Sequence, residues 1–94
     1  MELNRTSMIG NRIRTTRERY RLSIAELATR TNGHLSPSRI ANFEAGIRRP
    51  GIEEIEAIAA AFGDISAAWL LTLDAETAAD AGLVLGQQVT SGRR

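Results

Sequence analysis

Apolar residues recur every three or four positions along most of the chain, which is the spacing of one face of an α-helix. In the first such segment Ile9, Ile13, Thr16 and Tyr20 share one stripe. Strict alternation of apolar and polar residues, which would indicate a half-buried strand, does not occur before residue 82. The pattern predicts five helices, in the segments 7–20, 23–31, 36–46, 52–62 and 66–73. We therefore expect a small all-α domain.

Residues suited to helix ends stand at several predicted boundaries. Ser23 precedes the second helix and Glu26 follows three residues later, which is the capping-box arrangement. Ser36 and Pro37 open the third helix and Gly46 follows its last turn. Serine is favoured as an N-cap, proline at the first helical position and glycine just past the end. These residues place the ends of the second and third helices more closely than periodicity does.

Residues 74–94 form a less regular tail. Residues 74–81 would extend the fifth helix or add another one, and Gly82 would stop it. The apolar residues Leu83, Val84, Leu85 and Val89 would then either lie on the core as a frayed end or join a partner chain. We predict one domain over residues 1–73 and a tail over residues 74–94 that is a candidate dimerisation or partner-binding segment.

The third helix has two unlike faces. Each residue advances by about 100° around a helix, which places Ile40, Phe43 and Ile47 on one side, so that we expect the helix to bury Ile40 and Phe43. Turned away from the core are three polar residues, Ser38, Arg39 and Asn42. Arginine reads guanine edges, asparagine reads adenine edges, and serine reads either. The alternative is an ordinary amphipathic helix whose polar face is solvated.

Charge is divided unevenly along the chain, although its overall balance is only +1. Residues 1–50 carry ten arginines and four glutamates, a net +6, whereas residues 51–94 carry two arginines and seven acids, a net −5. This polarity indicates either that one half faces a polyanion or that the chain has a solvated charged face. Every basic residue is arginine, whose forked donors suit phosphates and guanine edges.

Two charged residues border the predicted core. The same step of about 100° places Glu44 beside the buried stripe of the third helix and Arg17 next to Ile13 and Tyr20 in the first. We therefore expect Arg17 and Glu44 to pair across these helices. The pair would set the angle of the third helix rather than add much net stability, because desolvation offsets most of the Coulomb attraction.

Several classes of protein are disfavoured by the composition. With no cysteine and a single histidine, His34, the chain lacks the residues for a thiolate or histidine metal site, so we expect no metal and no cofactor. Glu53, Glu54 and Glu56 resemble a solvated helix face, and we find no Gly-rich phosphate loop and no nucleophile–base pair. We therefore expect neither an enzyme nor a small-molecule substrate. No apolar run approaches the ~20 residues of a membrane span and the N-terminus does not resemble a secretion signal, so we expect a cytoplasmic protein with no membrane partner.

Three stretches of the chain resemble the helix-turn-helix domain of the Cro/cI family of phage and bacterial repressors, the XRE-type regulators: RIRTTRERYRLSIAELA, LSPSRIANFEAGIRRP and ISAAWLL. The resemblance covers about residues 9–71, and the combination of LS..ELA, S.S.I..FE.G.R.P and WLL is specific. It implies a compact five-helix lambda-repressor-like domain with a short C-terminal extension. In that family the second and third helices form the motif and the third enters the major groove of DNA.

The resemblance also implies roles for individual residues. By position, the residues that would meet bases are Ser38, Arg39 and Asn42. The residues that would lie at phosphates are Pro37, Arg48 and Arg49, with Arg12 and the backbone at Ser23 as weaker candidates. Arg17 and Glu44 match the buried ion pair of the family.

Two features depart from the family pattern. The family commonly has glutamine after the serine that opens the second helix, where this chain has Ile24, which removes one polar contact to DNA. The turn TRTNGHLSPS is also longer than usual by a couple of residues. Asn32 and His34 would either project toward phosphates or satisfy the backbone of this turn, and we favour the second interpretation.

The leading hypothesis is a sequence-specific transcriptional regulator, most simply a repressor, that binds a palindromic double-stranded DNA operator as a homodimer. The dimer surface would include the fourth and fifth helices, with residues 63–68, Trp69 and the tail, although Trp69 would lie mainly in the core. The alternative is an antitoxin-like or adaptor module whose residues 82–94 engage a protein partner. Co-purification of a second protein, lost on deletion of residues 82–94, would distinguish this alternative.

Overall fold

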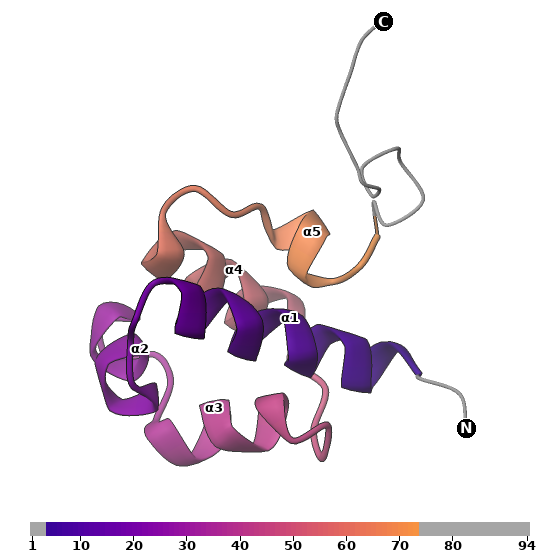
Figure 1. Ribbon diagram of the computed structural model, residues 1–94, viewed down its shortest axis with the longest axis horizontal. Helices are drawn as coiled ribbons and strands as arrows, with labels where there is room; N and C mark the ends of the chain where they lie inside the picture. Colours follow the sequence, from indigo (N-terminus) through magenta and orange to yellow (C-terminus); the bar gives the residue numbers. More distant parts are fainter. Residues whose placement is uncertain (1–3, 74–94) are drawn as a thin grey trace, which may run out of the picture.

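The computed structural model describes residues 4–73, which form a bundle of five α-helices and, over that range, no strand (Figure 1). The helices are α1 (Arg5–Arg19), α2 (Ile24–Arg30), α3 (Pro37–Glu44), α4 (Ile52–Phe62) and α5 (Ala67–Leu70). The all-α prediction is confirmed, as is the lambda-repressor-like arrangement of five helices. The predicted tail, with its apolar residues, lies outside the described residues.

The first helix begins earlier than its apolar stripe indicated. The side chain of Asn4 accepts a hydrogen bond from the Ser7 N–H at 2.8 Å, so α1 starts at Arg5 rather than near Ser7. The early residues are polar and add nothing to the periodicity, which explains why the stripe missed them. The fifth helix is shorter than predicted because it ends at Leu70, after a single turn capped by Ser66.

The predicted caps of α2 and α3 are confirmed. The Ser23 hydroxyl accepts from the Glu26 N–H at 3.0 Å, and the Glu26 carboxylate accepts from the Ser23 N–H at 2.7 Å. The Ser36 hydroxyl accepts from the Arg39 N–H at 3.2 Å. At the far end of α3, Gly46 adopts a φ of 75°, a left-handed conformation that glycine takes without strain. These local interactions satisfy backbone groups that helix ends leave without a partner inside the helix.

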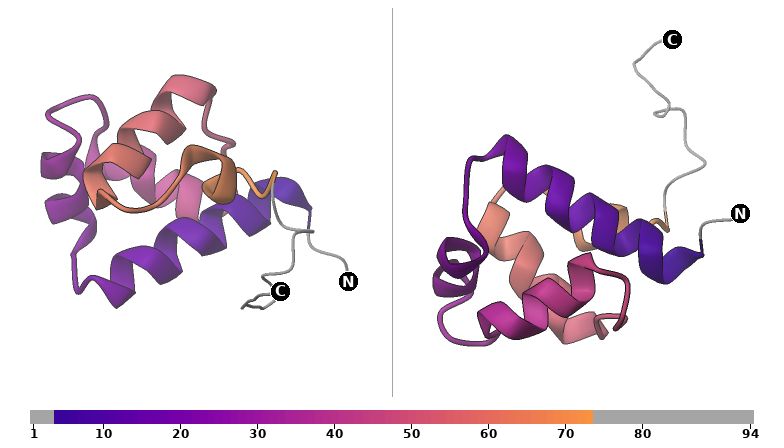
Figure 2. Two further views of the ribbon diagram at one scale, coloured as in Figure 1. Left: turned by 90° about the horizontal axis from the view of Figure 1, so that it is seen from above. Right: turned by 60° about the horizontal axis from the view of Figure 1, so that its bottom comes forward.

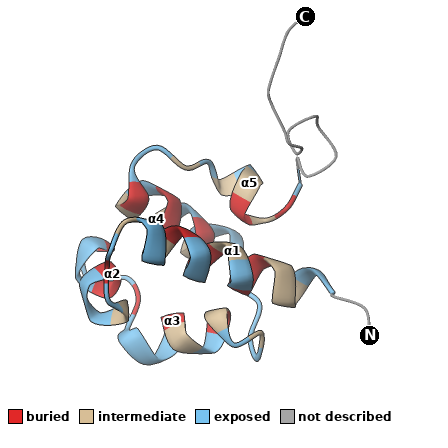
Figure 3. Cartoon of the chain, viewed as in Figure 1, coloured by how far each residue is buried: buried red, intermediate tan, exposed pale blue. Residues whose placement is uncertain are grey.

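The core lies where the inner faces of the helices meet (Figure 3). Its completely buried side chains are Ile9, Ile13, Leu27, Ile40, Phe43, Ile55, Ile58 and Leu70. Figures 1 and 2 show α1 crossing the bundle with α3 on one side and α5 on another. Because α3 contributes two of these residues, its rotation about its own axis is fixed by the core. Over residues 4–73, none of the helices has the length and apolar character needed to cross a membrane.

Two isoleucines that share the apolar stripes are exposed instead. Ile47 is 75% exposed, because α3 ends at Glu44 and the left-handed turn at Gly46 carries the chain away from the helical path. Ile52 is 62% exposed, because it is the first residue of α4 and the core contacts of that helix begin one turn later, at Ile55. A helical wheel therefore gives the wrong environment for Ile47, which lies past the end of α3, and for Ile52, which lies in the first turn of α4.

A close contact between α1 and α3 depends on glycine. A Cβ atom on Gly10 would lie 2.2 Å from the carbonyl oxygen of Phe43 and 2.9 Å from that of Glu44. No real side chain tolerates such distances, so the backbone of α3 approaches α1 in a way that only glycine at this position permits. Gly10 thus sets the spacing of the two helices at the C-terminal end of α3.

Candidate nucleic-acid interface

The outward face of α3 carries the three polar residues predicted to meet bases. Ser38, Arg39 and Asn42 are all exposed, while Ile40 and Phe43 on the inner face are completely buried. Together with Ser36 and Arg48, the three residues line an open hollow of about 170 Å³. Seen from the side where α3 comes forward (Figure 2, right), this helix runs along the surface of the bundle. A flat or convex polar ligand could therefore reach these side chains directly.

An ion pair holds α3 against α1 on the inner side. Nε of Arg17 donates to one oxygen of Glu44 at 2.7 Å and Nη2 donates to the other at 3.0 Å, so the contact is two-pronged. The side chains are only 13% and 7% exposed, and Nη1 of Arg17 also donates to the carbonyl of Leu22 at 2.8 Å. The structure thus brings together the two residues expected to pair. The hydrogen bond to Glu44 raises the pKa of Arg17, although burial alone would lower it.

Arg39 has a partner that the sequence did not indicate. Its Nη1 donates to Oε2 of Glu54 at 2.9 Å, and the two side chains are 44% and 28% exposed. Glu54 stands in the first turn of α4, and its other oxygen accepts from the Gly51 N–H at 2.8 Å. In the sequence this residue was only one of three acids on a solvated helix face. The loop between α3 and α4 determines this contact, and no periodicity rule describes its path.

The two arginines after α3 lie in different places. Arg48 lines the same hollow as Ser38 and Asn42, and its N–H donates to the Asn42 carbonyl at 3.3 Å. Arg49 extends to the start of α1, where its Nε donates to the Thr6 hydroxyl at 2.9 Å. Both are exposed cations. Only Arg48 is placed directly beside the candidate base-reading residues.

The weaker phosphate candidates are already engaged elsewhere. The guanidinium of Arg12 lies 4.5 Å from the ring centroid of Trp69 and donates to the Trp69 carbonyl, so it is directed to α5 rather than to α3. The N–H of Ser23 is bound to Glu26, and these contacts with Ser23 lower the pKa of the Glu26 carboxyl. A phosphate at the start of α2 would therefore meet a carboxylate. Trp69 itself is half-buried against the core.

Pro37 and Ile24 complete the motif. Pro37 is the first residue of α3 and is exposed, next to the residues of the hollow. Ile24, which stands where the family commonly has glutamine, packs with part of its surface against the core. Its side chain therefore contributes to the packing of the core.

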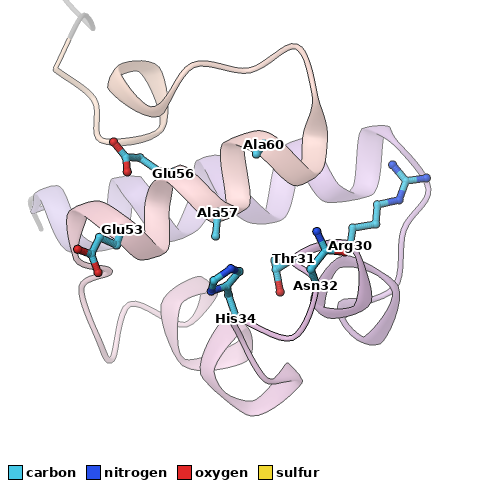
Figure 4. Close-up of a pocket in the computed structure, with 8 residues that line it drawn as sticks. All are labelled: Arg30, Thr31, Asn32, His34, Glu53, Glu56, Ala57 and Ala60. Atoms are coloured by element: carbon cyan, nitrogen blue, oxygen red, sulfur yellow. The ribbon is translucent and has the colours of Figure 1, made fainter.

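The long turn between α2 and α3 is held by a threonine. The hydroxyl of Thr31 donates to the Ala28 carbonyl at 2.6 Å and accepts from the Leu35 N–H at 3.1 Å. Asn32 contributes through its backbone, which adopts a φ of 58°. Figure 4 shows the side chains of Asn32 and His34 beside α4, where they line an open hollow of about 510 Å³ with Ala57 and other residues. The hydroxyl of Thr31 thus holds the turn, and the N–H groups of Asn32 and His34 donate to the carbonyls of Thr29 and Thr31.

Within residues 4–73, His, Asp and Glu side chains nowhere gather in a group of three that could hold a metal ion.

Comparison with protein families gives a match to the model described as Helix-turn-helix over residues 13–70. This match begins in the middle of α1 and ends with the last residue of α5, so it includes the complete α2–α3 unit and the outward face of α3. No curated protein and no solved structure matches the chain significantly.

Proposed function

The chain belongs to the helix-turn-helix family, as a DNA-binding transcription regulator of the XRE type, and from this premise we propose that it is a repressor that binds a specific palindromic operator as a homodimer. In this proposal α3 lies in the major groove, and the protein acts in the cytoplasm. Ser38, Arg39 and Asn42 would contact base edges, while Pro37, Arg48 and Arg49 would lie along the backbone of the duplex.

One observation carries the proposal: the exposed Ser38, Arg39 and Asn42 share a single hollow with the cation Arg48. Base edges are read by side chains of these types, whereas phosphates position the protein through arginine and backbone groups. A recognition surface needs both kinds of contact within the width of one groove, and this hollow supplies them. Because the inner face of α3 is buried, the helix cannot rotate about its axis, and Ser38, Arg39 and Asn42 stay on the outward face.

The small size of the surface supports the proposal that a second copy of the chain takes part in binding. The face of α3 offers only a few side chains, and a single small module buries less area than tight specific binding requires. Two copies related by a two-fold axis would place two α3 helices in successive major grooves about 34–36 Å apart. We assign the pairing surface to α4, α5, residues 63–68 and the tail, all of which lie outside the α2–α3 unit.

Selection of bound duplexes from a random pool tests the function. We expect a consensus made of two inverted half-sites whose centres are about one helical turn, 10–10.5 base pairs, or a multiple of it apart. A consensus with one half-site would remove the homodimer from the proposal. A pool without enrichment would contradict sequence-specific binding itself.

Arg39 and Arg48 should have different roles, and alanine variants of the two can be compared on the selected duplex. We expect Arg39→Ala to cost roughly 1–3 kcal/mol on that duplex and to relax the preference at one base position. Arg48→Ala should weaken binding to all duplexes alike and reduce the slope of log affinity against log salt by about one. Filter binding or anisotropy at several salt concentrations measures both. Equal losses on selected and random DNA for Arg39→Ala would assign that residue to the backbone instead.

A further inference from the structure

We propose that Glu54 is a specificity-determining residue that positions Arg39 for base reading, an inference that rests on the proposed function. The contact that motivates it is the 2.9 Å hydrogen bond from Nη1 of Arg39 to Oε2 of Glu54. It joins the one arginine among the candidate base readers to a different helix. A flexible side chain in the recognition face is thereby attached at its far end as well as at its Cα atom.

The carboxylate is itself held in place. Oε1 of Glu54 accepts from the Gly51 N–H at 2.8 Å, which closes the first turn of α4. The next residue, Ile55, and Ile58 about one turn further on are completely buried, so this end of α4 is anchored in the core. The hydrogen bond to Gly51 and the anchored helix thus hold the Glu54 carboxylate in place. The hydrogen bond from Arg39 in turn positions the Arg39 guanidinium.

The geometry leaves a usable edge on the guanidinium. Arginine has five N–H donors in a planar fork, and within residues 4–73 the contact with Glu54 occupies Nη1. The edge formed by Nε and Nη2 can still donate to two acceptors, which is the arrangement that reads O6 and N7 of guanine. A guanidinium that is held in place before binding loses less conformational freedom when it binds. It also cannot move to reach the acceptors of a different base. We infer that the base pair facing Arg39 contains guanine and that Glu54 enforces this choice.

Competition is the opposite interpretation, in which Glu54 withholds Arg39 from DNA and the pair must break on binding. The structure favours positioning, because the Arg39–Glu54 contact uses only Nη1 of the guanidinium, while the other carboxylate oxygen is bound to the Gly51 N–H. The side chain of Arg39 is 44% exposed, so a ligand reaches it without separating the pair.

The test uses Glu54→Gln in the full chain, with Glu53→Gln as the matched control. Both substitutions remove one negative charge from the first turn of α4, but Glu53 is exposed and only Glu54 contacts Arg39. In the Glu54→Gln variant an amide nitrogen, which is only a donor, replaces one of the two oxygens that accept from Gly51 and Arg39, so both contacts cannot persist in their present geometry. Binding is measured to the duplex that the unaltered chain selects and to its single-base-pair variants, at a temperature where circular dichroism shows each variant folded.

We expect Glu54→Gln to reduce discrimination about tenfold at the one base pair that Arg39→Ala also relaxes, and to leave other positions unchanged. Glu53→Gln should keep the whole preference profile, and Glu54→Gln should have no further effect at that base pair in an Arg39→Ala background. If Glu54→Gln gives the same profile as Glu53→Gln, or binds more tightly with its discrimination intact, the positioning role is wrong while the proposed function stands. If the unaltered chain prefers no duplex, the proposed function fails and takes this inference with it.

Discussion

Replacing Glu44 with alanine should lower the free energy of unfolding by about 3–5 kcal/mol, which is the usual cost of leaving a buried charge without its partner. The variant keeps Arg17, whose side chain is only 13% exposed and which then retains one hydrogen bond, to the Leu22 carbonyl. A guanidinium cannot lose its proton at accessible pH, so it cannot escape the penalty by neutralisation. The loss therefore reflects a stranded cation more than the attraction that the pair supplied.

Glu18→Ala is the matched control for that measurement. Glu18 is the neighbour of Arg17 in α1 and is exposed, so its removal changes the net charge equally without stranding a buried group. We expect it to change stability by less than about 0.5 kcal/mol. Urea unfolding followed by circular dichroism compares the variants. Replacing Arg17 and Glu44 together by apolar residues of similar volume should recover most of the loss, and a Glu44→Ala protein as stable as the parent would show that the ion pair does not constrain the fold.

The ion pair also shows what could be predicted from the sequence. The helix caps at Ser23 and Ser36, the inner face of α3 and the meeting of Arg17 with Glu44 all follow from the local sequence of the helices. The caps follow from the residue preferences of helix ends, whereas the inner face of α3 and the ion pair follow from the 100° step of the helix. The family match over residues 13–70 agrees with the resemblance that those residues suggested.

Contacts that pass through loops or between backbones were not predictable in this way. The Arg39–Glu54 pair depends on how the loop after Gly46 returns to α4, and Arg12 reaches Trp69 across a helix interface. Ile47 shares a side of the helical wheel with Ile40 and Phe43 but is exposed, because α3 ends before it. Side-chain periodicity describes one helix at a time, so it does not show what another helix brings to the same place.

Gly10 is the clearest example of information that periodicity does not contain. It occupies a buried position in α1 between the core residues Ile9 and Ile13, where a glycine reduces helix propensity by about 1 kcal/mol relative to alanine. A glycine kept inside a helix at that cost indicates a close backbone approach. The sequence identified neither this role nor the partner, which is the last turn of α3.

We therefore expect Gly10→Ala to destabilise the domain by about 3 kcal/mol, the upper part of the range for overpacking, although alanine is the better helix former. The new methyl group would meet the Phe43 carbonyl at 2.2 Å, and a backbone atom cannot move aside as a flexible side chain can. Thr15→Ala is the control, because Thr15 is an exposed residue of the same helix and alanine there should be neutral or slightly stabilising. Thermal and urea unfolding measure both variants. Any gain in stability for Gly10→Ala would mean that α1 and α3 are farther apart than the structure places them. The angle at which α3 presents Ser38, Arg39 and Asn42 would then differ as well.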